Sequence, residues 1–313
     1  MPRRRRGPVA PGRQPGESPS AAIRLLWDEP APGPWNMALD EALMETARRG
    51  VITLRLYGWS PPCLSLGRNQ RARGFYDAGA AGARGIGIVR RPTGGRAVYH
   101  GPELTYSVAA PTGQWGSLRE SYGRINGAIA RGLSELGVPV ALAGAGGAGA
   151  GGRGGESGPA RVSRPGAHTS AERVHGRETP RPRPGSCFQH PLPGEVTVTG
   201  RKLVGSAQWR RGGAFLQHGS LLLRDEQALV RELGRTPPGG GEAALAGRGE
   251  RSIGLAEVCE TLPSLERLGR ALCRGFEAEF QLPVRRGAAS AEERGCAGRL
   301  EEEYADAAWT WRR

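Results

Sequence analysis

The sequence predicts an α+β fold: a mixed, largely antiparallel sheet flanked by helices, with a small helical C-terminal part. Short strand-like segments rich in Val, Ile, Leu and Tyr are separated by Gly-containing turns, which is typical of hairpins. Segments with helical spacing lie among them without alternating regularly with strands, which disfavours a parallel α/β sheet. A chain of 313 residues is long enough to bury a sizeable core.

The first half of the chain opens on a strand and a helix. The helical segment begins at Pro34 and ends before Gly50, and both residues are typical of those positions. Further on, a Thr93-Gly94-Gly95 turn separates two strand-like segments and predicts a hairpin. We expect strands at 23–27, 51–57, 63–66, 86–91, 96–99 and 104–110, and helices at 34–49 and 118–136.

The second half contains more strand-like segments, separated by Gly-Arg and Arg-Gly-Gly turns, and then two helical stretches. We expect strands at 138–142, 195–199, 202–209 and 214–223, and helices at 262–280 and 289–311. The C-terminal part is therefore expected to be helical.

Two segments contain too few large apolar residues to offset the entropy lost on ordering. They predict a disordered basic arm at 1–20 and a disordered Gly/Arg-rich insert at 144–185. A Gly/Pro-rich stretch beginning at Thr236 predicts a linker. The expected organisation is a main domain at 21–235, interrupted by the insert, and a small helical extension at 252–313.

The chain carries 44 basic and 30 acidic residues, a formal charge of +14. More than half of this excess lies in the arm and the insert, so it supports a nucleic-acid partner only weakly. No other segment resembles a base-reading or stacking module, and a basic nucleic-acid-binding protein is the disfavoured alternative. No apolar run is long enough to span a membrane, and the initial arginines lack the apolar segment of a secretory signal.

Cysteine usage bears on metal sites and on compartment. The five cysteines form no C-x-x-C pair, which disfavours a zinc ribbon or a disulfide scaffold. We therefore expect no metal site and a cytoplasmic location.

The single lysine of the chain, Lys202, stands among 43 arginines. Arginine can replace most surface lysines at little energetic cost, but not where a compact ammonium with a tunable charge is required. Small residues, Gly205, Ser206 and Ala207, follow it closely. Lys202 is therefore a candidate functional residue, with a surviving surface lysine in a hairpin turn as the alternative.

Cys187 is the second candidate, because it follows the flexible insert and lies near this lysine in sequence. A thiol in such surroundings can act as a thiolate nucleophile, although an arbitrary cysteine is more often an inert buried thiol. His100 and His218, each followed by a glycine, are candidates for lining a cleft. The glycine pair at 94–95, with arginines on both sides, can let backbone N–H groups approach an anion or a carbonyl.

Three separate motifs resemble one known family. The stretch R-R-P-T-G-G-R-A-V-Y-H-G-P-E-L-T-Y-S at 90–107 is similar to the signature of the lipoate and biotin protein ligase superfamily. The stretch G-R-K-L-V-G-S-A-Q at 200–208 and the stretch L-Q-H-G-S-L at 216–221 are similar to its catalytic lysine strand pair. The resemblance implies a biotin/lipoyl ligase-like catalytic domain.

Within that superfamily, Cys187-Phe188 before the lysine strand resembles the octanoyltransferase branch. The resemblance implies an enzyme that moves octanoyl from acyl carrier protein to a lysine of a lipoyl domain or of glycine-cleavage H protein, without a cofactor. It implies Cys187 as the acyl-accepting nucleophile and Lys202 as its electrostatic partner. The implied substrate-binding residues are Arg91, Gly94, Gly95, Arg96, Ala97, Val98, His100, Gly205, Ser206, Ala207 and His218.

The alternative within the same superfamily is an ATP-dependent lipoate–protein ligase. It would use ATP and Mg²⁺, with Lys202 contacting the carboxylate and the adenylate phosphate, and Cys187 would be incidental.

Overall fold

The structure is a computed structural model, and it describes residues 22–144, 186–188, 191–235 and 252–313. The predicted arm at 1–20 lies outside the described residues. So do the predicted insert, except for Gly144, and the predicted linker from Thr236 onward.

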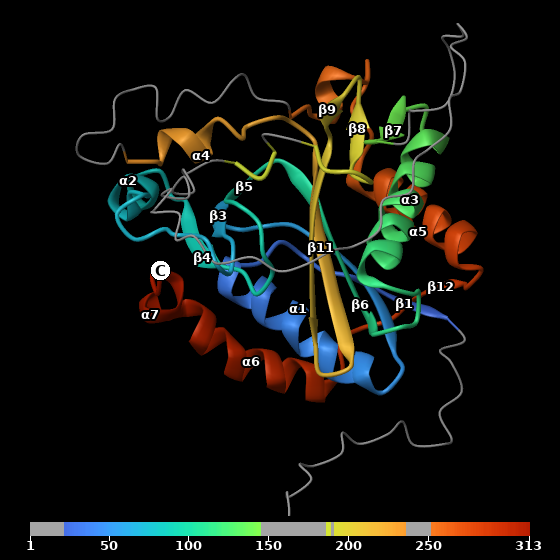
Figure 1. Ribbon diagram of the computed structural model, residues 1–313, viewed down its shortest axis with the longest axis horizontal. Coiled ribbons are helices and arrows are strands. Elements are labelled where there is room, and N and C mark those ends of the chain that lie inside the picture. Colours follow the sequence, from blue (N-terminus) through green and yellow to red (C-terminus); the bar gives the residue numbers. More distant parts are fainter. Residues whose placement is uncertain (1–21, 145–185, 189–190, 236–251) are drawn as a thin grey trace, which may run out of the picture.

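A six-stranded sheet forms the centre of the molecule, in the order β10-β11-β6-β2-β1-β12 (Figure 1). Its strands are β1 (Ile23–Trp27), β2 (Ile52–Tyr57), β6 (Glu103–Pro111), β10 (Val204–Arg211), β11 (Ala214–Leu222) and β12 (Val284–Arg286). The pairs from β10 to β2 are antiparallel, whereas β2-β1 and β1-β12 are parallel. The predicted mixed, largely antiparallel sheet is confirmed.

Helices cover both faces of this sheet (Figure 1). Helices α1 (Gly33–Arg48) and α6 (Ala291–Ala305) pack with alternate residues such as Leu26 and Leu216, whereas α3 (Leu118–Glu135) and α5 (Leu265–Phe280) pack with residues such as Leu54 and Val108. The two core clusters use opposite faces because successive strand residues alternate in direction.

Glycines bring α3 and α5 into close contact. A Cβ on Gly132 would lie 2.4 Å from the carbonyl oxygen of Ala271, and one on Gly275 would lie 2.1 Å from that of Ala128. Only glycine permits this backbone approach. The packing of α3 against α5 therefore depends on two positions, Gly132 and Gly275, that are 143 residues apart in the sequence.

A second sheet, in the order β4-β3-β5, lies beside α1 and carries the predicted glycine turn (Figure 1). It consists of β3 (Cys63–Leu66), β4 (Gly87–Arg90) and β5 (Val98–His100). The expected hairpin across 93–95 is wrong, because β3 lies between β4 and β5 and pairs with both. Residues 91–97, which include Gly94 and Gly95, therefore form a crossover loop between β4 and β5, called the glycine loop below.

A third small sheet, β7-β8-β9, contains the lysine. Its strands are β7 (Val140–Leu142), β8 (Val196–Val198) and β9 (Arg201–Lys202). The predicted strand at 202–209 is divided at Leu203, so Lys202 pairs with Thr197 in the small sheet while β10 joins the central one.

The C-terminal residues contribute more than helices. Strand β12 pairs in parallel with β1 at the sheet edge, which the sequence analysis did not predict. The expected helix at 289–311 is interrupted at Asp306, which caps α7 (Ala307–Thr310). The short elements α2 (Ala78–Ala83), α4 (Leu229–Glu232) and η2 (Leu255–Glu257) were also not predicted.

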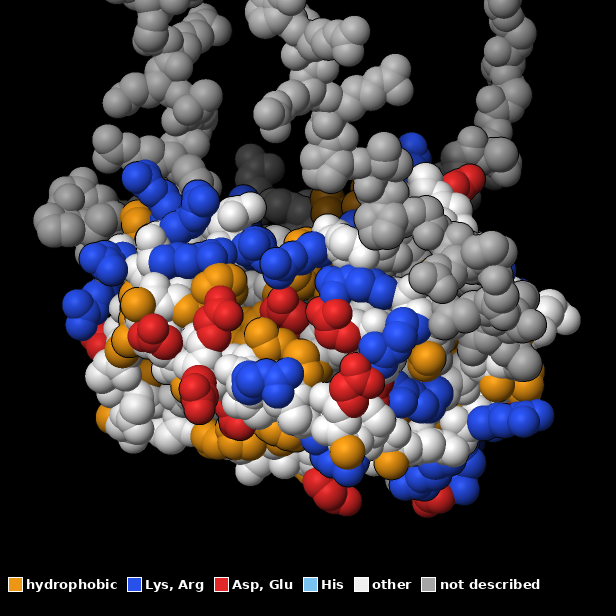
Figure 2. Space-filling model, turned by 90° about the horizontal axis from the view of Figure 1, so that it is seen from below, with side chains coloured by type: hydrophobic (Ala, Val, Ile, Leu, Met, Phe, Trp, Pro, Cys, Tyr) orange, Lys and Arg blue, Asp and Glu red, His pale blue; other side chains and the backbone are white. Residues whose placement is uncertain are grey.

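Figure 2 shows one face of the molecule, on which acidic side chains interleave with arginines across the centre while arginines gather along one margin. Helices α1 and α6 are linked at the surface by the ion pair Arg49–Glu292. No helix among the described residues is both long and apolar enough to cross a membrane.

We predict that Glu293→Gln lowers the free energy of unfolding by about 2–3 kcal/mol near neutral pH, because it leaves a largely buried arginine without its charge partner. Glu293 accepts hydrogen bonds from Arg24 at 2.5 Å and from Thr46 at 2.5 Å, and it closes the capping box of α6. Burial raises the pKa of Glu293, but these donors outweigh burial and lower it to about 2.

Because this pKa lies below its ordinary value of 4.5, the stabilisation is present above about pH 4.5 and is lost as the pH falls towards 2. Urea unfolding measured between pH 3 and pH 7 should show the variant and the wild type converging at the acidic end. The exposed Glu292→Gln is the control and should follow the wild type. A constant difference between Glu293→Gln and wild type across this range would contradict the assignment.

Candidate active site

A small pocket lies where the central sheet meets β3 and β5. The predicted residues that line it are Arg91, Val98, His100, Cys187, Gly205, Ser206, Ala207 and His218. The wall also includes residues that were not predicted, namely Met37, Tyr57, Trp59, Ser65, Thr105, Gly219 and Ser220.

Cys187 is held at this pocket through its backbone. Ser186 forms a parallel bridge with Ala97, and the Cys187 N–H donates to the Ala97 carbonyl at 2.9 Å. The predicted residue Ala97 therefore contributes its main chain, and it places the thiol beside the glycine loop. The side chain of Cys187 is partly exposed, while Phe188 next to it is buried against Val98 and Leu222.

Lys202 is fully buried, and its ammonium has two oxygen partners. Nζ donates to the backbone carbonyl of Cys187 at 3.0 Å and to Oε1 of Glu195 at 2.7 Å. The Glu195 side chain is equally buried and also accepts from the Leu192 N–H and the Tyr122 hydroxyl. Lys202 is thus not a surface lysine, and the structure pairs its charge with a carboxylate that sequence reasoning missed.

Arg91 crosses under the glycine loop. Its Nη1 donates to Oγ of Ser65 at 3.1 Å and to the Ser65 carbonyl at 3.0 Å. Its Nη2 donates to the carbonyls of Gly94 at 2.9 Å and Arg96 at 2.5 Å. Two further predicted residues, Gly94 and Arg96, therefore act through their main chains, because their carbonyls bind this buried guanidinium.

Gly95 has a backbone conformation that favours glycine, with φ of 92°. A Cβ here would lie 2.9 Å from Nη2 of Arg91 and 3.5 Å from Sγ of Cys187. The glycine therefore makes room for the guanidinium and the thiol on the same side of the loop.

His100 stacks on Trp59, with ring centroids 3.9 Å apart. Its Nδ1 lies 2.8 Å from Oε1 of Glu103, and its Nε2 lies 2.7 Å from Oγ of Ser65. Ser65 thereby links His100 to Arg91. Oε1 of Glu103 also accepts from the hydroxyls of Thr105 and Ser220, which fixes the polar end of the pocket.

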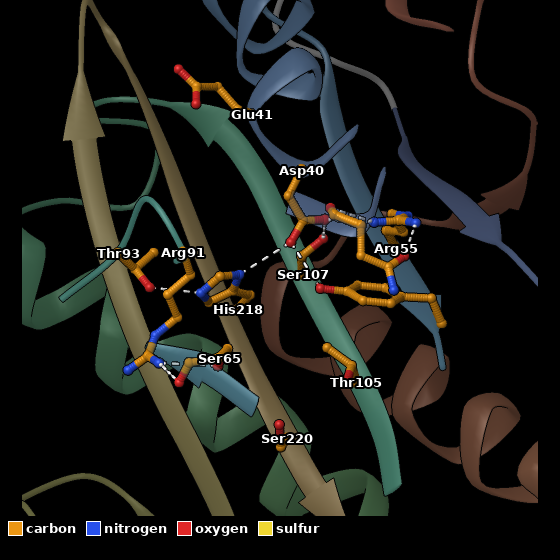
Figure 3. Close-up of polar contacts among 12 residues, drawn as sticks. Asp40, Glu41, Arg55, Ser65, Arg91, Thr93, Thr105, Ser107, His218 and Ser220 are labelled. Atoms are coloured by element: carbon orange, nitrogen blue, oxygen red, sulfur yellow. Dashed lines mark hydrogen bonds and ion pairs between the residues drawn. The ribbon is translucent and has the colours of Figure 1, made fainter. Parts of the chain in front are cut away.

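His218 is linked to the glycine loop and to α1 (Figure 3). Its Nε2 lies 2.7 Å from Oγ1 of Thr93, and its Nδ1 lies 3.1 Å from Oδ2 of Asp40. Burial lowers the pKa of His218 below its usual 6.5, although the Asp40 carboxylate opposes this shift. The ring is therefore neutral at pH 7.

Asp40 is fully buried and was not predicted as a functional residue. It accepts from Arg55 at 2.9 Å, from the Tyr57 hydroxyl at 2.9 Å and from the Ser107 hydroxyl at 2.7 Å, as Figure 3 shows in part. Burial raises the pKa of Asp40, but His218, Arg55 and Ser107 lower it below 3.8. The site thus rests on an ionised carboxylate in the core.

Among the residues described, no group of three or more His, Cys, Asp and Glu side chains is placed to hold a metal ion. The polar side chains of the pocket are instead bonded to one another in pairs and chains.

Residues 32–277 match the family described as the lipoyl protein ligase A/B catalytic domain. The chain belongs to this family. The resemblance seen in its three motifs is confirmed over most of its length.

Relatives within the lipoyl protein ligase A/B family cover nearly the whole chain. The octanoyltransferase LipM of Kyrpidia tusciae is 39% identical over 298 residues, covering 93% of this chain and 98% of that protein. The octanoyltransferase LipM of Moorella thermoacetica is 38% identical over 306 residues, covering 94% of this chain and 100% of that protein. The predicted octanoyltransferase branch is thereby confirmed at the level of the family.

Solved structures share the fold. Lipoate-protein ligase A bound with ATP superposes with a TM-score of 0.66 at 20% identity, covering 93% of this chain and 98% of that one. A bipartite lipoate protein ligase of Thermoplasma acidophilum superposes with a TM-score of 0.66 at 21% identity, covering 94% and 97%.

We predict that Gly205→Ala destabilises the protein by about 1–3 kcal/mol, the usual range for overpacking a tight site. A Cβ on this residue would lie 2.7 Å from Cζ of Phe188, the neighbour of Cys187. Urea unfolding measures the loss. The control is Gly127→Ala in α3, whose Cβ would meet nothing within 4 Å and should not destabilise. Equal stability of the two variants would show that Phe188 is not packed here.

Proposed function

We propose that this chain transfers an octanoyl group to the lysine of a lipoyl domain through a thioester on Cys187. The observation that carries the proposal is a thiol, that of Cys187, in the wall of the pocket. The family supports the reaction, because relatives matching over nine-tenths of the chain are octanoyltransferases. The wall of the pocket near Met37, Trp59 and Val98 is apolar and suits an acyl chain.

In the first step, the Cys187 sulfur attacks the carbonyl carbon of an acyl thioester. A new carbon–sulfur bond forms, the bond to the donor's sulfur breaks, and the donor leaves as a thiolate that takes a proton from solvent. Thiol-for-thiol exchange is nearly isoenergetic. Backbone N–H groups of the glycine loop stabilise the oxyanion, a contribution of about 3 kcal/mol for each donor.

In the second step, the neutral amine of the acceptor lysine attacks the Cys187 thioester. The amide forms, the Cys187 thiolate leaves, and the amine proton passes to solvent. An amide is more stable than a thioester, so the reaction runs downhill and requires neither ATP nor another cofactor. This distinguishes the proposal from the ATP-dependent ligase.

Lys202 acts in this proposal as a positioning residue. Its Nζ holds the carbonyl of Cys187 at 3.0 Å, and Glu195 compensates its charge within the core. The pair thereby fixes the backbone that carries the thiol. The sequence interpretation made Lys202 the electrostatic partner of the nucleophile, and the contact with Glu195 favours the positioning role instead.

For the donor we propose octanoyl-acyl carrier protein, and for acceptors the lipoyl domains of 2-oxoacid dehydrogenases or glycine-cleavage H protein. We place the enzyme in the cytoplasm, where its five free cysteines would stay reduced.

Intact-mass spectrometry after mixing the protein with octanoyl carrier protein tests the nucleophile. We predict a single octanoyl adduct, located on Cys187 by peptide mapping. Cys187→Ser should lose both the adduct and transfer to an apo lipoyl domain, while the control Cys296→Ser on α6 keeps both. Full transfer by Cys187→Ser would remove the covalent mechanism, and transfer that requires ATP would favour the ligase.

We predict that Lys202→Arg lowers the rate of transfer at least about 100-fold, because a 1 Å misplacement of a reacting group can cost that much. The guanidinium is bulkier than the ammonium and does not fit between Glu195 and the Cys187 carbonyl.

The rate is measured as octanoylation of an apo lipoyl domain under single-turnover conditions. The matched control is Arg201→Lys on the same strand, whose side chain is partly exposed and pairs with Glu257. Retained activity in Lys202→Arg would show that a compact ammonium is not needed.

A further inference from the structure

Arg91 is a buried cation that pairs with no carboxylate among the described residues. Only 4% of it is exposed. Its acceptors are the backbone and hydroxyl oxygens of Ser65 and the carbonyls of Gly94 and Arg96, and none of them carries a charge. Burying a guanidinium without a counter-charge is costly, so this position calls for a negative group nearby.

Two other buried cations near the pocket, Lys202 and Arg55, are already paired with carboxylates. The ammonium of Lys202 is paired with Glu195. The two histidines face the carboxylates of Glu103 and Asp40, and Asp40 is also paired with Arg55. Arg96 lies in the same loop, and its carbonyl is bound by Arg91. Arg91, which lines the pocket, is therefore a buried cation without a directly bonded carboxylate, and its charge can act on a negative group in the pocket.

Neither histidine has a ring nitrogen available to take the thiol proton. Nδ1 of His100 faces the carboxylate of Glu103, which can only accept, so Nδ1 carries the proton and Nε2 accepts from the Ser65 hydroxyl. In the same way, the Thr93 hydroxyl faces Nε2 of His218, whose Nδ1–H donates to Asp40. Cysteine–histidine general-base catalysis does not fit this arrangement.

The guanidinium and the thiol lie close together on the same side of Gly95. The point where a Cβ on Gly95 would stand is 2.9 Å from Nη2 of Arg91 and 3.5 Å from Sγ of Cys187. Nη2 and Sγ are thus no more than 6.4 Å apart, and an opposite charge this close favours the ionised form of a thiol. Burial lowers the pKa of Arg91, and electrostatic interactions with Cys187 and Tyr76 oppose that shift.

We propose that Arg91 is the charge partner of the Cys187 thiolate, so that the nucleophile is activated by an ion pair rather than by a histidine or by Lys202. This inference rests on the proposed role of Cys187 as nucleophile. The thiol loses its proton to solvent, Arg91 stabilises the thiolate, and the thiolate attacks the thioester as described above. When the donor's thiolate leaves and is protonated by solvent, no net proton has been transferred to the protein.

The pH dependence of Cys187 alkylation by iodoacetamide tests this ion pair without any acyl donor. The rate at the Cys187 peptide is followed by mass spectrometry from pH 5 to pH 10 in the full chain. We expect Arg91→Met to move the midpoint of the alkylation profile upward by about one pH unit or more, because the thiolate loses its opposite charge. Arg91→Lys should stay close to the wild type.

A double variant, Lys202→Met with Glu195→Gln, removes the neighbouring ion pair as a whole and should move the midpoint less than Arg91→Met does. If Arg91→Met is not folded by circular dichroism, Arg91→Gln carries the same expectation, because it keeps hydrogen-bond donors without the charge. A wild-type midpoint in the uncharged Arg91 variant would overturn the proposal. So would a shift confined to the double variant.

This outcome is separate from that of the proposed function. An octanoyl adduct on Cys187 together with an unchanged alkylation midpoint would reject Arg91 alone. A shifted midpoint with no adduct would instead reject the acyl-enzyme while leaving the ion pair in place.

Discussion

The buried carboxylate of Asp40 holds together the elements that form the pocket. It accepts hydrogen bonds from Arg55 and Tyr57 on β2, from Ser107 on β6 and from His218 on β11, while itself lying on α1. Two antiparallel pairings, β2 with β6 and β6 with β11, bring these donors to one place. The glycine loop is also linked to Asp40, because His218 hydrogen-bonds both to Asp40 and to Thr93 in the loop. Removing one partner of such a buried network leaves others unsatisfied, so its members act as a unit.

A second buried pair, Lys202 and Glu195, helps to hold the segment that carries Cys187. Residues 186–188 have little regular structure of their own, yet they are held by Ala97 on one side and by Lys202 on the other. Glu195 offsets the energetic cost of burying the Lys202 ammonium, since an isolated ammonium would not be stable in the core. The thiol is thus presented by a short segment whose geometry is set by two neighbouring sheets.

Much of this could be predicted from the sequence, and the limits have physical causes. Periodicity located β1, α1, β3 and β11 closely because their apolar residues repeat at the spacing of the buried face. It could not show that β3 lies between β4 and β5, since strand order depends on long-range pairing. Motifs and composition singled out Cys187 and Lys202. Asp40 and Glu195 escaped notice because a buried acid has no local signature of its own, although Asp40 stands among mostly apolar buried residues of α1.

The pairing of β12 with β1 has a consequence for how the chain folds during synthesis. Ile23 and Val284 are register partners, although 260 residues separate them. While the ribosome is still translating the middle of the chain, β1 has one edge of free N–H and C=O groups that could pair with another nascent chain. The central sheet is complete only once β12 has been synthesised and has paired with β1. Until then the outer edge of β1 is an unprotected strand edge at which another chain can associate.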